Sequence, residues 1–269
     1  MRPETQRDKG PEDWQSWRMN SGAPMRPLAI VGGGSRGLGF ETARGLAARG
    51  YDLALIAKDP ARLNSAREQL FAEYSPTQSG LKITTHAADL ESQAATRKVA
   101  EEINASLPTA QVMVLAHGVM SEKMSKTLRT TSQEWRRVMA INLDSTFIAI
   151  NTLAPAMAEA RNGRVIIFSA CLGRMSGPGN AGGLAPYRIS KAGVNALVKN
   201  LSYETGLGAR GFLVDAICPN HCRTDMGGPD APRSAQEGAE TAIWLATREF
   251  DPAVDKTGLL WEDRQIVDW

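Results

Sequence analysis

The sequence predicts an α/β fold with one doubly wound parallel sheet and helices on both of its faces. Two observations support this prediction. Short apolar runs alternate with longer segments of helical periodicity along the chain, and the first two runs are joined by a glycine cluster and one such helix. Alternation of this kind favours a parallel sheet with right-handed crossovers. Since the body of the chain shows neither a second composition nor an internal repeat, we expect a single domain.

Each element has its own signal. Strands buried on both faces of a parallel sheet are predominantly apolar, and such strands are predicted at 28–31, 53–57, 83–87, 112–116, 165–169 and 213–217, of which 83–87 (Ile-Thr-Thr-His-Ala) is the most polar. Helical periodicity occupies the segment between the glycine cluster and Gly50, and then 60–74, 92–107, 132–160, 187–205 and 234–247. The segment 258–269 is expected to add one last edge strand.

Composition bounds the kind of protein. A chain of 269 residues with 42% apolar content can bury a large core. Its net charge of +2, with acids and bases interspersed, predicts neither a nucleic-acid nor a membrane partner, and no stretch reaches the roughly 18 apolar residues of a membrane span. Three cysteines and three histidines lack metal-site spacing and suit a cytoplasmic protein. Residues 1–26 are polar and predict a flexible tail before a domain at 27–269.

The first predicted strand leads into a glycine cluster, a helix and a second strand, which is the pattern of a dinucleotide-binding, Rossmann-like unit. Glycines let the backbone approach a pyrophosphate, whose charge is stabilised at the helix N-terminus. Two registers fit this loop. Gly32, Gly34 and Gly37 form G-x-G-x-x-G, whereas Gly33, Gly37 and Gly39 form G-x-x-x-G-x-G. The loop alone does not distinguish them.

Tyr187 and Lys191 are candidate catalytic residues. They lie four residues apart in a predicted helix, which places them on one face about one turn apart. A nearby ammonium favours the phenolate, so we expect it to lower the pKa of the tyrosine from its ordinary value of about 10. Such a tyrosine can give a proton to a carbonyl oxygen or take one from an alcohol.

Together these motifs resemble the short-chain dehydrogenase/reductase family, which combines G-x-x-x-G-x-G with Y-x-x-x-K. The resemblance covers about residues 27–269 and favours the register that begins at Gly33. WRRVMAINLDSTF carries Asn142 at the position of the family's asparagine, and residues 219–224 resemble the family's P-G-x-x-x-T loop, with Asn220 at the glycine position. The stretch 112–118 keeps only Gly118 of the family's N-N-A-G.

The resemblance implies a nicotinamide dinucleotide as cofactor. An acid at the end of the second strand would select NAD, but alignment with the family puts Ala57 there, and Asp59 before Pro60 is typical of a helix N-cap. Arg36 and Lys58 are then placed to receive a 2′-phosphate, so NADPH is preferred over NADH; the alternative is that both are ordinary solvent-facing charges. The expected cofactor-binding residues are Gly33, Ser35, Arg36, Gly37, Leu38, Gly39, Lys58, Asp89, Leu90, Gly118, Tyr187, Lys191, Pro219 and Thr224.

The family's chemistry implies that Tyr187 protonates a substrate carbonyl as hydride leaves the nicotinamide. Lys191 would lower the pKa of the tyrosine and hold the ribose, and Asn142 would anchor a water that links Lys191 to solvent. A family serine would donate a hydrogen bond to the substrate oxygen, and here its position is occupied by Ala170.

Three alternatives follow for the missing serine. Ser169, the fourth member of our expected catalytic set, serves after a local shift of the strand; Ser176 serves instead; or the site lacks this donor. Loss of such a donor typically costs about 10²–10³ in rate. His117, which replaces a small residue beside the cofactor, is either a substituted acid/base group or a structural histidine.

The segment 222–247 resembles the substrate loop of carbonyl-reductase-like members, with a capping box at Ser234 and Glu237. This resemblance implies a medium-sized carbonyl substrate, and the family implies a homodimer or homotetramer. We favour an NADPH-dependent carbonyl reductase or alcohol dehydrogenase. The alternatives are a family member that catalyses a non-redox step, such as a cyclase, dehydratase or isomerase, and a nucleotide sensor. A sensor needs neither Tyr187 nor Lys191.

Overall fold

The structure is a computed structural model that describes residues 26–122, 125–177 and 182–269. The tail predicted at 1–26 lies outside these residues except for Arg26. The guanidinium of Arg26 donates hydrogen bonds to Asp52 Oδ1 (2.9 Å) and Gln78 Oε1 (3.2 Å). Arg26 is therefore hydrogen-bonded to the domain.

The described residues form one eight-stranded sheet in the order β3-β2-β1-β4-β5-β6-β7-β8, which confirms the predicted fold class. Every neighbouring pair is parallel except β7 and β8. The single edge strand predicted at 258–269 is instead a tight hairpin, because Asp263 and Arg264 both adopt the positive φ that reverses the chain. The strands are β1 Leu28–Gly32, β2 Asp52–Ala57, β3 Ile83–Ala87, β4 Val112–Leu115, β5 Gly163–Phe168, β6 Phe212–Ile217, β7 Leu260–Glu262 and β8 Gln265–Val267.

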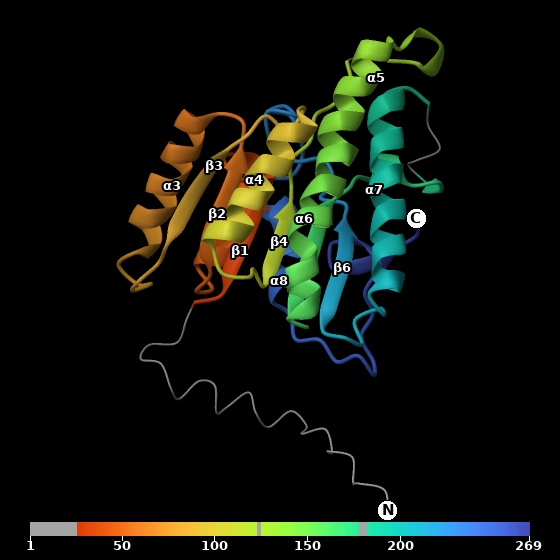
Figure 1. The fold of residues 1–269 in the computed structure, drawn as a ribbon. Coiled ribbons are helices and arrows are strands. Elements are labelled where there is room, and N and C mark those ends of the chain that lie inside the picture. Colours follow the sequence, from red (N-terminus) through yellow and green to blue (C-terminus); the bar gives the residue numbers. More distant parts are fainter. Residues whose placement is uncertain (1–25, 123–124, 178–181) are drawn as a thin grey trace, which may run out of the picture.

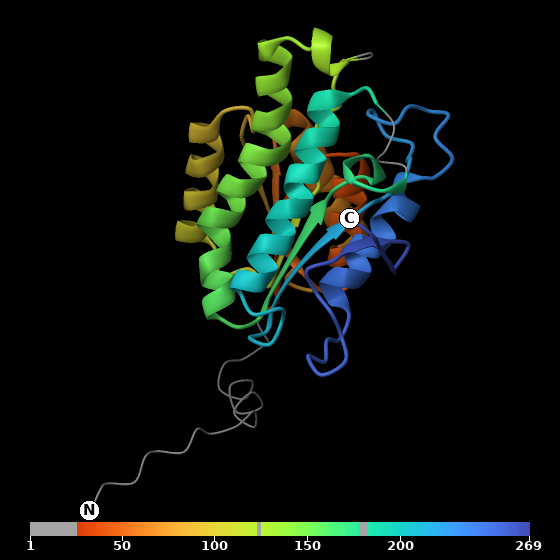
Figure 2. The same ribbon diagram turned by 90° about the vertical axis from the view of Figure 1, so that its right-hand side faces the viewer.

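Helices cover both faces of the sheet and bury a separate core on each (Figures 1 and 2). One face carries α4 (Gln93–Ser106), α6 (Ser145–Glu159) and α7 (Ala185–Glu204). The other carries α2 (Gly37–Ala47), α3 (Pro60–Tyr74) and α8 (Ala235–Thr247). No helix in the described ranges is both long and apolar enough to cross a membrane.

The helix predicted over 132–160 is interrupted. It consists of α5 (Ser132–Met139), a π-helical turn η3 (Ala140–Asp144) and α6. A π turn widens the helix locally and is often found at functional sites, and this one contains Asn142. Two short 3₁₀ segments complete the fold, η2 (Thr127–Arg129) before α5 and η4 (Cys171–Gly173) after β5.

The start of α2 differs from those of four other helices. Side chains cap α3, α4, α5 and α8 through Asp59, Ser92, Thr131 and Ser234. Within the described part of the chain, α2 has no side-chain cap. The backbone N–H groups of its first turn are therefore left for another partner.

Candidate active site

The loop between β1 and α2 contains close contacts that leave no room for a side chain. Gly33 has a φ of 78°, and a Cβ there would lie 2.8 Å from the backbone nitrogen of His117. Gly39 packs against the carbonyl oxygen of Gly33 so closely that a Cβ would overlap it. Gly37 also has a positive φ of 56°. Each glycine of the G-x-x-x-G-x-G register is therefore constrained by a positive φ or by a close contact, and Gly32 and Gly34 also have close neighbours, in His117 and Leu55.

The same loop fits the diphosphate of a dinucleotide. Gly33 and Gly39 have no side chains to keep a ligand away from the backbone. The uncapped N-terminus of α2 offers N–H groups and the positive end of the helix dipole to an anion. Ser35 is half-buried in the turn, and Leu38 packs on the core beneath the first turn of the helix. The predicted glycine-loop residues therefore lie together around one anion-binding cradle.

The cations expected to bind a 2′-phosphate both face carboxylates. Lys58 Nζ lies 2.7 Å from Asp89 Oδ2, and this hydrogen bond lowers the pKa of Asp89. Arg36 pairs with Asp225 of the loop after β6, and Arg62 of α3 approaches the same carboxylate at 3.7 Å. These side chains are largely exposed, so each pair contributes little to stability. A bound phosphate could take the place of the Asp225 carboxylate.

The loop after β6 packs against the glycine loop. A Cβ at Gly37 would lie 3.2 Å from Thr224 Cγ2, so the two loops are in contact. Asn220 has a φ of 61°, a conformation that asparagine tolerates, which accounts for its place at a family glycine. The carbonyl oxygen of Pro219 accepts a hydrogen bond from the Cys222 thiol (3.1 Å). Pro219 and Thr224 thus lie on the loop that contacts the glycine cradle.

The segment 222–247 contains the helix that its periodicity predicted at 234–247. Residues 235–247 form α8, whose Ile243 packs against Gly45 of α2. The predicted capping box is present, since Glu237 N donates to Ser234 Oγ (3.1 Å) and Ser234 N donates to Glu237 Oε2 (2.7 Å). Residues 222–234 alone are left to form a loop.

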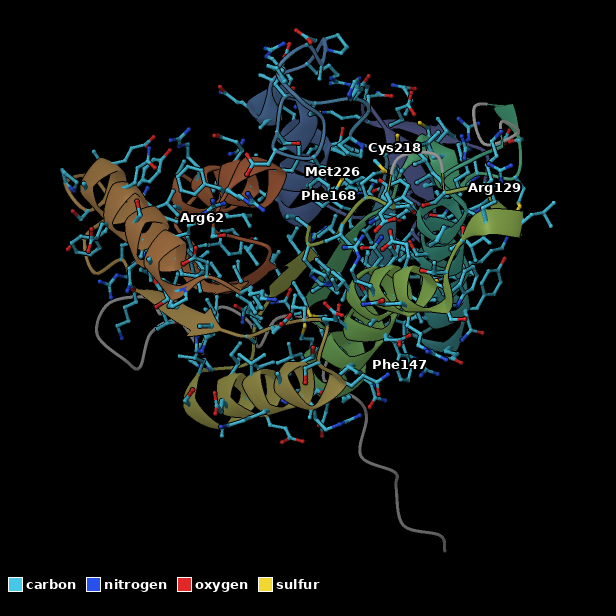
Figure 3. All side chains as sticks on the ribbon, turned by 90° about the horizontal axis from the view of Figure 1, so that it is seen from above. Arg62, Arg129, Phe147, Phe168, Cys218 and Met226 are labelled. Carbon is cyan, nitrogen blue, oxygen red and sulfur yellow. The ribbon has the colours of Figure 1, made fainter. Side chains whose placement is uncertain are left out.

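The ends of β5, α7 and the π turn bring the candidate catalytic residues together. Lys191 Nζ lies 5.9 Å from the centroid of the Tyr187 ring and donates a hydrogen bond to the carbonyl oxygen of Phe168 (2.6 Å). Asn142 is fixed by Val119, whose backbone N–H donates to Oδ1 (2.8 Å) and whose carbonyl accepts from Nδ2 (3.0 Å). Figure 3 looks onto the carboxyl ends of the strands, where Phe168 lies near the middle of the molecule.

Gly118 keeps a small space open between Asn142 and Lys191. A Cβ at Gly118 would lie 3.3 Å from Asn142 Oδ1 and 3.5 Å from Lys191 Nζ. A second bond from Asn142 Nδ2 to Ser190 Oγ (3.0 Å) ties the π turn to α7. The one family residue kept from N-N-A-G therefore borders two of the candidate catalytic side chains.

Burial sets the protonation of Tyr187 and Lys191. Desolvation raises the pKa of Tyr187, and the neighbouring Cys218 and Cys171 raise it further. Desolvation also lowers the pKa of Lys191 to about 8. The expected lowering of the tyrosine pKa is therefore wrong for this structure, because burial outweighs the distant ammonium. At neutral pH Tyr187 holds its proton, which suits it to donate to a carbonyl oxygen.

The structure does not support Ser169 as the donor to a substrate. Its buried hydroxyl donates to Asn195 Oδ1 on α7 (2.5 Å), and a hydroxyl has only one hydrogen to give. Ser176 Oγ donates to the carbonyl oxygen of Trp269 (3.4 Å). Because Ala170 has no donor, a site without the family's serine fits the geometry best among the three alternatives.

His117 fits the structural alternative. The hydroxyls of Ser145 and Thr146 donate to backbone carbonyls one turn earlier, so they can only accept from His117 Nε2, at 2.8 and 3.3 Å. The hydrogen must therefore be on Nε2, and Nδ1 is buried without a partner among the described residues. Desolvation, aided by the charge of Lys191, lowers the pKa of His117 to about 3. The neutral ring fills the space beside Gly32, where a Cβ would lie 2.8 Å from Nδ1.

Comparison with known proteins agrees with these motifs. A family model described as short chain dehydrogenase matches residues 27–235. The chain belongs to the short-chain dehydrogenase family. It is thus an oxidoreductase by family, and the resemblance seen in the glycine loop and the Tyr–Lys helix is confirmed at that level.

Several relatives of this short-chain dehydrogenase are named 3-oxoacyl-[acyl-carrier-protein] reductase FabG. The Escherichia coli protein is 32% identical over 200 residues, covering 74% of this chain and 75% of the relative. The Staphylococcus epidermidis protein is 29% identical over 203 residues, covering 75% and 78%. Their name does not confirm the carbonyl-reductase-like subtype that the segment 222–247 implied.

Solved structures share the fold. A putative short chain dehydrogenase from Pseudomonas syringae aligns with a TM-score of 0.75 at 18% identity, covering 87% of this chain and 93% of the other. A blue fluorescent protein from a metagenomic library, solved in complex with NADPH, aligns with a TM-score of 0.73 at 24% identity, covering 87% and 94%. Identities this low support the fold alone.

Three features of this family member's site were not predicted from the sequence. Asn195 holds Ser169, and Arg62 shares Asp225 with Arg36. The third is the contact between Cys171 and Cys218 at the ends of β5 and β6. Each joins residues far apart in the sequence, and only Asn195, two turns after Tyr187 on its predicted helix, carried even a positional hint.

Proposed function

We propose that this short-chain dehydrogenase is an NADPH-dependent reductase of a medium-sized carbonyl compound, with Tyr187 as its proton donor. The observation that carries the proposal is the convergence of Tyr187, Lys191 and Asn142 at the carboxyl ends of the central strands. When bound, NADPH supplies the hydride for such a reduction. The chain's own residues must then bind it, orient the carbonyl and deliver one proton.

The cofactor-binding part of the proposal rests on an anion cradle and a cluster of cations. The glycine loop and the uncapped start of α2 would hold the diphosphate. Arg36 and Lys58 would bind the 2′-phosphate, with Arg62 close enough to assist. Asp89, the buried Leu90 and Gly118 would border the adenosine half, and Pro219 and Thr224 the nicotinamide half.

The proton chemistry follows from burial. Because its pKa is raised, Tyr187 holds its proton at neutral pH and can release it to the oxygen that becomes negative as a carbonyl is reduced. Lys191, with a pKa of about 8, is largely charged at neutral pH and stabilises the tyrosinate that results. Asn142 positions the π turn against α7 beside Lys191. These protonation states favour reduction over alcohol oxidation.

A ketone is the substrate class that the comparisons support. The relatives' name describes reduction of a 3-oxoacyl group, which contains a ketone. Met175 and Met226 are exposed after η4 and on the loop 222–234, and methionines provide an adaptable apolar surface. These features support a carbonyl substrate of moderate size with apolar groups.

Replacement of Tyr187 tests the function. Tyr187→Phe removes the proton donor, so NADPH oxidation with a panel of ketones should fall by about 10²–10⁴-fold, while NADPH still binds in a fluorescence titration. Tyr203→Phe, on the exposed side of the same helix, is the matched control and should retain turnover. Undiminished ketone-dependent NADPH oxidation by Tyr187→Phe would refute the proposed role.

A non-redox reaction is the second candidate, and the missing serine donor favours it. Ala170 and the bond between Ser169 and Asn195 leave the expected substrate oxygen without its usual partner. Tight NADPH binding with no oxidation by any ketone, aldehyde or quinone in the panel would support this candidate. Carbonyl-dependent oxidation of NADPH would count against it.

We also propose that the chain forms a homodimer or homotetramer. A hollow of about 430 Å³ is lined by residues of α4, η3, α6 and α7; its apolar members are Leu143, Phe147, Ile148 and Leu197, and its polar members are Gln93, Arg97 and Asp144. Phe147 is 49% exposed and points outward from α6 (Figure 3). Burial of such apolar surface in a second subunit is favourable. Light scattering of the purified protein measures the assembly directly.

A further inference from the structure

Two cysteines that the proposed chemistry does not use lie together at the carboxyl edge of the sheet. The parallel strands β5 and β6 are neighbours, and their register ends at the pair Phe168 and Ile217. Cys218 directly follows β6, and Cys171 begins the 3₁₀ turn that follows β5. Figure 3 shows Cys218 near the middle of this edge, close to the labelled Phe168.

The two residues are in direct contact. The backbone N–H of Cys171 donates to Cys218 Sγ over 3.0 Å. The backbone nitrogen is two bonds from Cys171 Cβ, so Cys218 Sγ already lies near the position that a bridging sulfur would need. A disulfide between them requires Cα atoms that lie about 4.4–6.8 Å apart.

The pair has the asymmetry of a reactive and a resolving thiol. Cys171 is partly exposed, whereas Cys218 is 2% exposed. The neighbouring Cys218 side chain lowers the pKa of Cys171 to about 6, while the pKa of Cys218 itself is raised, so Cys218 retains its proton. A thiolate is the nucleophilic form of cysteine. Burial instead raises the pKa of Cys222, and its thiol donates to Pro219.

We propose that Cys171 and Cys218 form an oxidisable dithiol that a peroxide converts into an intramolecular disulfide beside Tyr187. The Cys171 sulfur attacks one peroxide oxygen, the O–O bond breaks, and the leaving oxygen departs as water, giving a sulfenic acid. The Cys218 sulfur then attacks the Cys171 sulfur. The S–S bond forms, the S–O bond breaks, and a second water leaves with the Cys218 proton. The two thiols lose two electrons, which reduce the peroxide.

The disulfide would alter the catalytic site. Both sulfurs influence Tyr187 electrostatically, and Cys171 directly follows Ala170, at the position where the family holds the substrate oxygen. The bond would also tie the 3₁₀ turn after β5 to the end of β6. We therefore expect the oxidised protein to lose most of its turnover and to regain it when a dithiol reductant cleaves the bond.

Treatment of the purified full-length protein with hydrogen peroxide tests the proposal without relying on turnover. Of the three cysteines, two should disappear from a thiol titration under denaturing conditions, the intact mass should fall by about 2 Da, and peptide mapping should link Cys171 to Cys218. Dithiothreitol should reverse all three changes.

Variants separate this pair from other thiol chemistry. Cys222→Ser should still lose about 2 Da, whereas Cys171→Ser and Cys218→Ser should not. Cys171 is the safer replacement, because it is partly exposed and its variant should fold. A cross-link that involves Cys222, or oxygen addition without any loss of 2 Da, would overturn the proposal. If the mass falls as expected in a protein that reduces no carbonyl, the dithiol stands and the proposed function fails.

Discussion

The hydroxyl of Ser169 donates to the side-chain oxygen of Asn195 over 2.5 Å, inside the contact between β5 and α7. This bond gives Ser169 a role in holding the catalytic helix against the sheet. Asn195 also donates to the carbonyl oxygen of Gly173 (3.2 Å), so one side chain joins the strand end, the 3₁₀ turn and α7. Ser169, next to the family's catalytic position, thus helps to hold α7 in place and does not itself face the substrate.

Ser169→Ala should therefore reduce stability more than chemistry. It leaves Asn195 Oδ1 buried without its donor, which costs about 1–3 kcal/mol in the free energy of unfolding, measurable by urea denaturation. Turnover per folded molecule should stay within about three-fold of the parent, since a catalytic donor would be worth far more. Ser176→Ala, which removes a longer bond of 3.4 Å, is the control and should change stability less. A hundred-fold loss of kcat at unchanged stability would restore Ser169 to the catalytic set.

The lowered pKa of Lys191 should appear in the pH dependence of stability. Its pKa is about 8 in the folded protein and 10.5 ordinarily, so between these values the unfolded chain binds more protons. The contribution of Lys191 to the free energy of unfolding should therefore rise with pH across this window, by at most about 1.4 kcal/mol per pH unit. Urea denaturation of the parent and of Lys191→Met should show a difference that grows from pH 8 to 10. A constant difference would contradict the lowered pKa.

Asp225 should compete with the 2′-phosphate for Arg36 and Arg62. Asp225→Asn removes the carboxylate that pairs with both cations, so NADPH should bind about two- to five-fold more tightly, which matches the small energy of exposed pairs. NADH binding should not change. Asp230→Asn makes the same charge change at an exposed position of the same loop and is the control. If Asp225→Asn raised the affinity for NADH as much as for NADPH, or if Asp230→Asn raised NADPH affinity equally, the cause would be a general change in charge.

Gly32 and His117 should behave as a coupled pair. Gly32→Ala places a Cβ 2.8 Å from His117 Nδ1, and such overpacking costs about 1–3 kcal/mol. His117→Ala leaves a cavity, but in the double variant the new methyl group no longer meets the ring. Thermal or urea unfolding of the four proteins should therefore give a combined loss smaller than the sum of the two single losses. If the losses in the free energy of unfolding were additive, the imidazole of His117 and the missing side chain at Gly32 would not be in contact.

The sequence by itself determined the fold and the motif residues of the site. The apolar runs and helical periods predicted six strands of the sheet to within about two residues, and α3 was predicted with its bounds at Pro60 and Tyr74. The spacing of Tyr187 and Lys191 and the glycines at 33, 37 and 39 led to the family. These signals are local, because backbone periodicity and turn conformation depend on neighbouring residues in the chain.

Tertiary structure alone decided how the side chains are used. Burial reversed the expected shift in the pKa of Tyr187, since desolvation depends on everything packed around the phenol. Ser169 hydrogen-bonds Asn195, and Arg36 forms an ion pair with Asp225. Both pairs are far apart in the sequence, so no local sequence pattern predicts them. The proton of His117 was placed only by the hydroxyls of α6 that surround it. Contacts and desolvation arise when distant segments pack, so they become readable only in the folded chain.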